Sequence, residues 1–229
     1  MELEKRNTAR PVEFRASESG PGVLTGYAAV YNRYSQNMGG FVEQVAPGAF
    51  AKSLGDKVAV VARYNHSDSA LLGTTEAGTL ILESDDIGLR YDVILPDTTS
   101  GRDVAVLAQR GDLRYSSFAF HALEDEWDLT EQGFPLRTLV SAQLVDVAPV
   151  NSPAYLDTST GMRSLANHLH IEFEAVTAAS TEELRSLLNG EPAPVEEIRS
   201  EEENDDDGQG ETHPTVSLRQ KQLDLLNLK

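Results

Sequence analysis

The sequence of 229 residues is 40% hydrophobic, which is enough for a folded core, and it has no cysteine, which excludes disulfide bonds, thiol nucleophiles and cysteine-based zinc sites. The net charge of −18 argues against nucleic-acid binding as the main activity, because contacts with phosphate need clustered lysine and arginine. No apolar run is long enough for a membrane-spanning helix and residues 1–10 are too charged for a secretory signal, so we expect no membrane partner.

The negative charge is concentrated toward the C-terminus. Residues 172–229 contain 15 acidic and 5 basic residues, a net charge of −10, and the densest acidic run lies between Glu191 and Glu211. Such a run repels itself and stays solvated. We therefore predict a folded domain at residues 10–165 and an acidic, partly helical, flexible tail at residues 166–229.

Most of the predicted folded domain shows strand patterns. These patterns occupy residues 22–32, 58–65, 79–83, 89–95, 113–123 and 136–150. In the second of these segments, Val58, Val60 and Ala62 share one phase of an alternating pattern, which is typical of a half-buried strand. The turn-forming residues 85–88 separate the third and fourth segments and predict a hairpin.

Two short helices interrupt the predicted strands. One is expected at residues 49–54, after a Pro-Gly turn, and the other at residues 101–110. Ser100 and Asp103 have the spacing of a capping box, and Gly111 is a natural C-terminal stop. Many short strands with few helices favour a β-barrel or a sandwich with helices packed outside.

Two further helices are expected in the tail. Ser180 and Glu183 mark the start of one, which runs to Asn189. Residues 216–228 are also helix-like, with apolar side chains on two sides, so this helix needs a surface that covers it. A helix folded back on the domain and a docking peptide both fit this pattern.

The five histidines do not form an evident metal site. His168 and His170 lie past the predicted domain and His213 lies in the acidic segment, so we interpret all three as surface residues. A His-x-His pair without a third ligand at matching spacing is a weak signal for metal binding. We therefore expect no metal and no cofactor.

His66 follows the strand pattern of residues 58–65 and continues its interior phase. The residues on either side of it, among them Asn65 and Ser67, are typical of loops. A half-buried histidine at the end of a strand is well placed to act as a general base. Taken alone, this pattern fits a solvent-facing loop histidine better.

Ser116 and Ser117 stand in the middle of the strand pattern at residues 113–123, where serine is not favoured. Phe118 points toward the expected core, whereas Ser117 and Ala119 point to the other side. The small neighbour leaves room for a substrate carbonyl next to Ser117. The alternative is a pair of small residues that relieves crowding against an adjacent strand.

Asp146 is a lone acid in an apolar strand pattern, and a buried carboxylate is unfavourable unless it is paired. Pairing with a histidine would stabilise both groups and fix the imidazole tautomer. A structural salt bridge, for example to Arg137, is the alternative. The sequence contains no G-x-S-x-G, H-E-x-x-H, P-loop or dinucleotide-binding motif, which disfavours α/β-hydrolases, zincins and common nucleotide-dependent enzymes.

A set of short motifs in chain order resembles one known family, the prohead maturation proteases of tailed bacteriophages. These serine peptidases are similar in fold to the herpesvirus assemblins. The motifs stand at residues 26–32, 46–50, 65–66, 72–73, 88–89, 96–98, 111–113, 117–120, 144–147 and 149–155. Each motif is weak, but the ordered set covers most of the predicted domain.

The resemblance implies a role for three residues. The family's catalytic histidine falls on His66, and its nucleophile falls on Ser117, the serine directly before Phe-x-Phe. Its acid, commonly a glutamate, falls on Asp146, and Ala148 stands where a serine is usual. Ser117 would then attack the scissile carbonyl while His66 transfers the proton and Asp146 orients His66.

The resemblance also implies a fold, a function and partners. The expected fold is α+β, with an antiparallel β-barrel surrounded by a few helices. The expected activity is that of a serine endopeptidase that cuts the major capsid protein, its scaffold segment or a scaffolding protein, and itself, inside the assembling prohead in the host cytoplasm. Self-association is a further expectation. The alternative is a non-catalytic, scaffold-like assembly protein that retained the protease fold.

Overall fold

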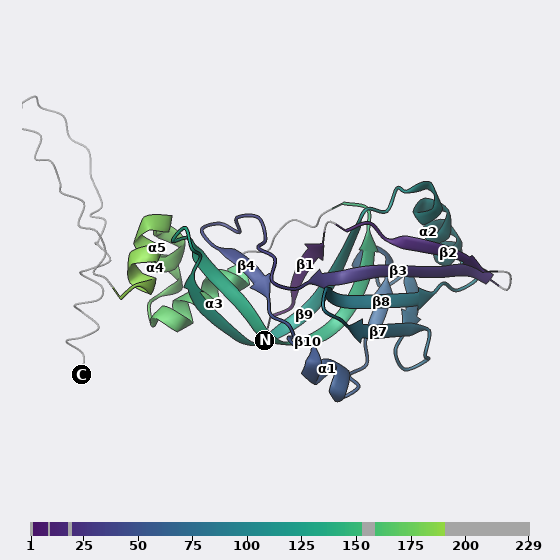
Figure 1. The fold of residues 1–229 in the computed structure, drawn as a ribbon, viewed down its shortest axis with the longest axis horizontal. Helices are drawn as coiled ribbons and strands as arrows, with labels where there is room; N and C mark the ends of the chain where they lie inside the picture. Colours follow the sequence, from purple (N-terminus) through teal and green to yellow (C-terminus); the bar gives the residue numbers. More distant parts are fainter. Residues whose placement is uncertain (1, 9, 18–19, 153–158, 191–229) are drawn as a thin grey trace, which may run out of the picture.

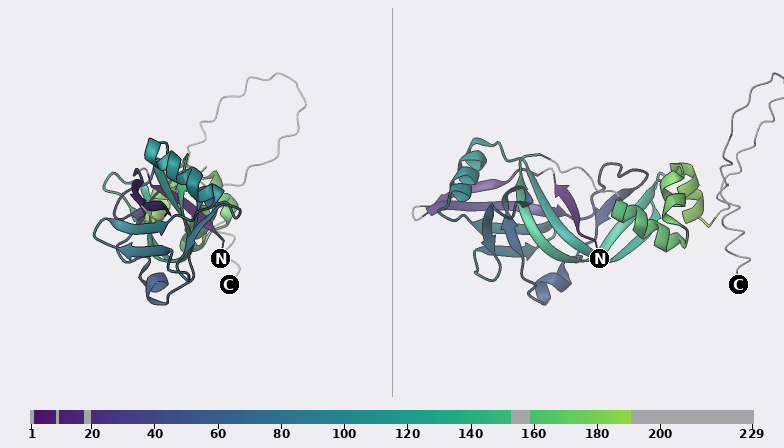
Figure 2. Two further views of the ribbon diagram at one scale, coloured as in Figure 1. Left: turned by 90° about the vertical axis from the view of Figure 1, so that its right-hand side faces the viewer. Right: turned by 180° about the vertical axis from the view of Figure 1, so that it is seen from behind.

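The computed structural model describes residues 2–8, 10–17, 20–152 and 159–190, which form two β-sheets and several helices (Figure 1). The molecule is elongated. Helix α2 (Thr99–Arg110) lies at one end, and helices α3 (Ser159–Leu169), α4 (Phe173–Ala178) and α5 (Thr181–Leu188) lie at the other end, as the view from behind in Figure 2 also shows.

The larger sheet has the strand order β1-β9-β10-β5-β6, with β4 also paired to β10. Its strands are β1 (Glu4–Thr8), β4 (Val42–Val45), β5 (Val61–Arg63), β6 (Leu71–Thr74), β9 (Tyr115–Leu129) and β10 (Pro135–Val150). The smaller sheet has the order β2-β3-β8-β7. Its strands are β2 (Glu13–Ser17), β3 (Gly20–Val30), β7 (Leu80–Ser84) and β8 (Gly88–Ile94).

The long hairpin of β9 and β10 organises the larger sheet. β10 pairs antiparallel with β9 along one edge, and along its other edge it pairs parallel with β4 near its start and with β5 near its end. The prediction of mainly strands with a few helices is confirmed. The predicted closed barrel is not found among the described strands, because they form two open sheets. One edge of β10 pairs with β9, and β4 and β5 pair with different parts of its other edge.

The hairpin predicted around residues 85–88 is confirmed as β7 and β8 of the smaller sheet. Asp85 explains the turn, since its carboxylate accepts hydrogen bonds from the backbone N–H groups of Ile87 at 2.8 Å and Gly88 at 2.9 Å. An aspartate that satisfies the following N–H groups is a common way to close such a turn.

The main core lies between the two sheets. Leu24, Tyr91 and Val93 of the smaller sheet and Phe118 and Leu144 of the larger sheet are all fully buried or nearly so in this cluster. Burial of aromatic and aliphatic side chains on facing strands is the main favourable contribution to such a two-layer fold. The sequence patterns of the strands therefore correspond to one shared core.

A second, smaller core joins the helices α3, α4 and α5 to the far ends of β9 and β10. Its buried residues include Phe41, Trp127, Leu165 and Leu184, and the rings of Phe41 and Trp127 pack edge to face with centroids 5.1 Å apart. Residues 166–190 thus pack against the sheet. The predicted boundary at residue 165 lies within α3.

The helix predicted at residues 101–110 is α2, and Gly111 ends it in the left-handed conformation with a φ of 79°. Its N-cap is Thr98 rather than the predicted Ser100, because the Thr98 hydroxyl accepts a hydrogen bond from the N–H of Gly101 at 3.2 Å. The helix expected at residues 49–54 is α1 (Ala51–Gly55).

The helix start predicted at Ser180 is confirmed in α5, where Ser180 and Glu183 form both hydrogen bonds of a capping box. The helix predicted at residues 216–228 lies outside the described residues. Within the described parts of the chain, no helix is long and apolar enough to span a membrane.

Candidate active site

Two strands of the larger sheet and the turn that follows a third bring together the three residues that the sequence singles out. His66 Nδ1 is 2.5 Å from Asp146 Oδ1, and His66 Nε2 is 2.6 Å from Ser117 Oγ. The side chains of His66 and Asp146 are only 6% and 3% exposed, and Ser117 is fully buried. An imidazole that bridges a carboxylate and a serine hydroxyl is the arrangement of a serine-protease triad.

The register of β9 and β10 explains why Ser117 and Asp146 are neighbours. Asp146 on β10 lies opposite Ala119 on β9, which is two residues from Ser117 and therefore on the same face of the strand. A bulge between Leu144 and Asp146 interrupts the pairing at this point. The alternation predicted from the sequence, with Ser117 on the face opposite to Phe118, is confirmed.

The segment that carries His66 departs from the prediction. Residues 58–65 were expected to form one strand, but β5 covers only Val61–Arg63, and a 3₁₀ turn η1 (Tyr64–His66) follows it. Asn65 and His66 both have positive φ values, 53° and 56°, which end the strand. Such conformations in residues other than glycine are uncommon and occur frequently at functional sites.

The turn is held against the end of β10. The Asn65 side-chain oxygen accepts a hydrogen bond from the backbone N–H of Asn151 at 3.1 Å. β5 runs beside β10, with Val61 opposite Asp146. The short turn η1 therefore follows directly from a strand that is already paired next to Asp146, and this brings His66 back to the sheet.

Asp146 has a second partner that the sequence did not reveal. Arg63 Nη1 donates a hydrogen bond to Asp146 Oδ2 at 3.1 Å, and the Nη2 of the same guanidinium lies 3.1 Å from the exposed carboxylate of Asp68. Asp146 therefore forms a salt bridge, as the alternative interpretation of the sequence allowed, but with Arg63 rather than with Arg137. Each oxygen of the buried carboxylate has a donor, which satisfies the requirement for burying a charge.

Ser116 and Ser117 differ in their surroundings. The Ser116 hydroxyl lies 2.9 Å from the hydroxyl of Tyr91 in the main core, where burial raises the pKa of Tyr91 above its ordinary value. Ser116 is thus a packing residue, in agreement with the alternation of the strand. Ser117 Oγ instead lies next to His66 and also donates a hydrogen bond to the backbone carbonyl of Arg6 at 2.9 Å.

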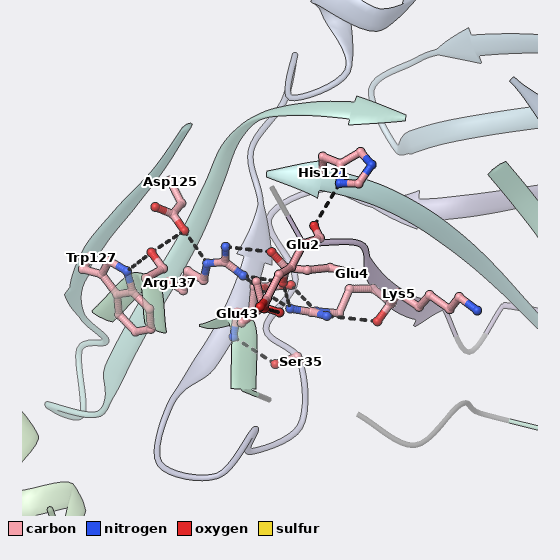
Figure 3. Close-up of polar contacts among 12 residues, drawn as sticks. Glu2, Glu4, Lys5, Ser35, Glu43, His121, Asp125, Trp127 and Arg137 are labelled. Atoms are coloured by element: carbon pink, nitrogen blue, oxygen red, sulfur yellow. Dashed lines mark hydrogen bonds and ion pairs between the residues drawn. The ribbon is translucent and has the colours of Figure 1, made fainter. Parts of the chain in front are cut away.

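Next to the triad, the structure contains an ionic cluster of the buried residues Glu4, Arg6, Glu43 and Arg137 and the half-buried Asp125. Figure 3 shows Glu4, Glu43, Asp125 and Arg137 side by side. Arg6 Nε donates to Glu43 at 2.7 Å, and Arg137 donates to Glu4 at 2.8 Å and to Asp125 at 2.6 Å. Burial by itself would lower the pKa of both arginines, but the neighbouring carboxylates outweigh it and the net effect raises both pKa values.

Sequence reasoning missed this cluster. Glu4 and Arg6 precede the predicted domain, and their charges gave no sign that β1 is part of the sheet. One signal was available, because Arg137 is the single basic residue in the strand pattern at residues 136–150. A single charge at an interior position predicts a buried partner of opposite charge.

The remaining histidines lie apart from the triad. His121 Nδ1 is 2.9 Å from the backbone carbonyl of Glu2 (Figure 3), and His168 and His170 are exposed. His213 lies outside the described residues. In the part of the chain that the structure describes, no three histidine, aspartate or glutamate side chains are grouped as metal ligands.

Comparison with known proteins identifies a family over most of this chain. A family model described as caudovirus prohead serine protease matches residues 10–171. None of the curated proteins compared with the chain matches it significantly. A solved structure of the bacteriophage T4 capsid assembly protease is similar over 66% of this chain and 98% of that chain, with 14% identity and a TM-score of 0.42, a likeness too weak to carry an argument.

Proposed function

Because this chain belongs to the caudovirus prohead serine protease family, we propose that it is the endopeptidase that matures the capsid by Ser-His-Asp catalysis. The observation that carries the proposal is His66, whose ring nitrogens lie 2.5 Å from Asp146 and 2.6 Å from Ser117. Family membership makes the protein a serine protease, and the contacts of His66 support these three residues as its catalytic groups.

The proposed reaction begins with Ser117. Its Oγ attacks the scissile carbonyl carbon while His66 Nε2 takes the hydroxyl proton and then gives it to the leaving amine. Asp146 accepts the hydrogen bond from Nδ1–H, which keeps Nε2 free to accept a proton and stabilises the imidazolium that forms. Water then hydrolyses the acyl-enzyme, with His66 again acting as the base.

Arg63 is proposed as a positioning residue for Asp146. Its guanidinium donates to the carboxylate oxygen that does not contact His66, so it fixes the rotation of the carboxyl group. The family commonly has the longer glutamate at this position. The shorter aspartate reaches His66 here because β5 pairs directly with β10 at Asp146 and η1 follows β5 without an intervening loop.

The proposed substrates are the major capsid protein, its scaffold segment or a scaffolding protein, and the protease itself. The proposed place of action is the interior of the assembling prohead in the host cytoplasm. Residues 10–165 remain the proposed protease domain and residues 166–229 the proposed tail, whose first part, residues 166–190, packs against the sheet. The strongly negative chain suits contact with protein partners rather than nucleic acid. The likeness to the herpesvirus assemblins and self-association remain predictions.

The test is co-expression with the major capsid protein of the same phage, followed by intact-mass measurement of all products. We expect defined fragments with the wild type and none with Ser117→Ala. Ser116→Ala is the matched control, because it removes the neighbouring hydroxyl, which faces Tyr91 rather than His66, and it should keep substantial activity. Normal shells without any cleavage by the wild type would favour the non-catalytic, scaffold-like alternative.

A further inference from the structure

The N-terminal strand β1 lies along the edge of β9 and reaches the proposed nucleophile. β1 pairs antiparallel with β9, with Asn7 opposite Ser117 and Arg6 opposite Phe118. The Arg6 carbonyl accepts a hydrogen bond from Ser117 Oγ at 2.9 Å. β1 is the outermost strand on this side of the larger sheet, so its departure would expose the backbone edge of β9.

The Arg6 carbonyl competes with His66 for the single proton of the Ser117 hydroxyl. A proton that Ser117 donates to the Arg6 carbonyl is not available to Nε2 of His66, the proposed base. With β1 in this position, Ser117 is therefore not activated.

The same carbonyl also occupies space that a substrate needs. Reacting atoms must approach to about 3–3.5 Å before attack, which is close to the distance between Ser117 Oγ and the Arg6 carbonyl oxygen. The Arg6 carbonyl oxygen thus already lies at this distance from Oγ, and a scissile carbonyl would compete with it for contact with Ser117. β1 demonstrates that an extended backbone fits along this edge and presents a carbonyl to Ser117.

We infer that the edge of β9 from Ser116 to Phe120 is the docking edge for the extended segment of the polypeptide to be cut, and that β1 leaves this edge when the segment binds. The inference rests on the proposed function. Addition of an extended peptide to a strand edge uses backbone hydrogen bonds and is a recurring mode of peptide recognition. The strand that leaves and the strand that binds would use the same N–H and C=O groups of β9.

The ionic cluster explains why β1 stays in place without substrate. Glu4 and Arg6 of β1 both belong to the cluster, where Arg6 contacts Glu43. Glu4 contacts Arg137, as Figure 3 shows. Lys5 lies on the opposite side of the strand and is exposed. β1 is thus held by one edge and one face, and opening of such an edge strand is a local event that leaves the rest of the sheet paired.

A reversible disulfide between β1 and β9 tests the inference, because the chain has no other cysteine. Lys5 and Ala119 are directly opposite each other on the antiparallel strands β1 and β9. The Cα atoms of such a pair are about 4.5–5.5 Å apart, a distance that a disulfide bond can span. The variant is K5C/A119C. The matched control is E83C/R90C, which joins the paired positions Glu83 and Arg90 of the smaller sheet.

Cleavage of the major capsid protein in trans is measured for each full-length variant before and after reduction. Oxidised K5C/A119C should cut at least about 100-fold more slowly than its reduced form, because activity scales with the fraction of molecules in the open state. Oxidation of the control should not change its rate. Equal rates for oxidised and reduced K5C/A119C would overturn the inference.

A second measurement uses the wild type and is independent of the cysteine variants. A fluorophosphonate probe reacts with Ser117 Oγ, forming a phosphonate ester and releasing HF. Hydrogen exchange of the backbone amides in the labelled protein is then measured by mass spectrometry. Labelling should remove the exchange protection of β1 but not that of β3. Retained protection of β1 in the labelled protein would overturn the inference.

The two proposals fail in different ways. If the wild type neither cuts the capsid protein nor reacts with the probe at Ser117, the proposed function is wrong. If the wild type cuts, but the disulfide has no effect or β1 stays protected after labelling, the proposed function stands and the docking edge is wrong.

Discussion

Loss of the Arg137 charge should destabilise the fold strongly, because this side chain is only 1% exposed and holds three carboxylates together. The ionic cluster contains three carboxylates and two guanidiniums, so Arg137→Met changes its net charge from −1 to −2. The methionine fills much of the vacated volume, which isolates the effect of charge. Removing one partner of a buried ion pair costs about 3–5 kcal/mol, and we expect this decrease in the free energy of unfolding.

Urea denaturation followed by circular dichroism measures this decrease. Arg15→Met is the matched control, because Arg15 has a 64% exposed side chain and forms a surface ion pair with Asp92. Its loss should cost less than about 1 kcal/mol. E4Q/R137M should recover part of the stability, since it also removes a stranded negative charge. The reasoning is refuted if Arg137→Met destabilises no more than Arg15→Met.

Four further predictions concern the triad, the smaller sheet and the tail. Asp146→Asn should lower kcat by up to about 10⁴-fold in capsid-protein cleavage, while Asp146→Glu keeps substantial activity; an unchanged rate for Asp146→Asn would remove it from the triad. Arg63→Gln should lower kcat about tenfold to 100-fold with little change in KM, because hydrogen bonds to charged groups contribute about 1.5–3 kcal/mol, and Arg63→Lys should restore part of the rate. Asp68→Asn, which changes only the exposed partner of Arg63, should leave kcat unaltered, and equal effects of these two changes would contradict the positioning role. Burial acts to raise the pKa of Asp85. Hydrogen bonds from a tyrosine hydroxyl and two backbone N–H groups have the opposite effect and are stronger, so the pKa of Asp85 lies below its ordinary value. Asp85→Ala should therefore reduce thermal stability at neutral pH, and its deficit should shrink as the pH falls through the carboxyl range, where the wild type loses the same stabilisation; a deficit that is independent of pH would rule this out. A chain truncated after Asn189 should still cut a substrate in trans but enter fewer proheads, counted as protease copies per shell, whereas a joint loss of thermal stability and cleavage would show that the removed residues support the fold.

The sequence alone predicted the features that depend on neighbouring residues. The hairpin of β7 and β8, the glycine stop at Gly111 and the capping box of Ser180 are all decided by a few consecutive residues and by local hydrogen bonds. The alternation that separates Ser117 from Phe118 is equally local, since successive side chains of a strand point to opposite faces. Chain-ordered motifs then singled out His66, Ser117 and Asp146.

Only the tertiary structure decided which of these residues meet and what else meets them. Ser117 contacts the backbone of Arg6, which is 111 residues away in the sequence, and Arg137 contacts Glu4 across 133 residues. The residues of β10 do not indicate that this strand pairs in parallel with both β4 and β5. For this reason the sequence led us to expect a barrel, whereas the structure has an open, mixed sheet. The reason is physical: turns and caps are satisfied within a few residues of the chain, whereas the pairing of strand edges and of buried charges depends on which distant segments supply the missing hydrogen bonds.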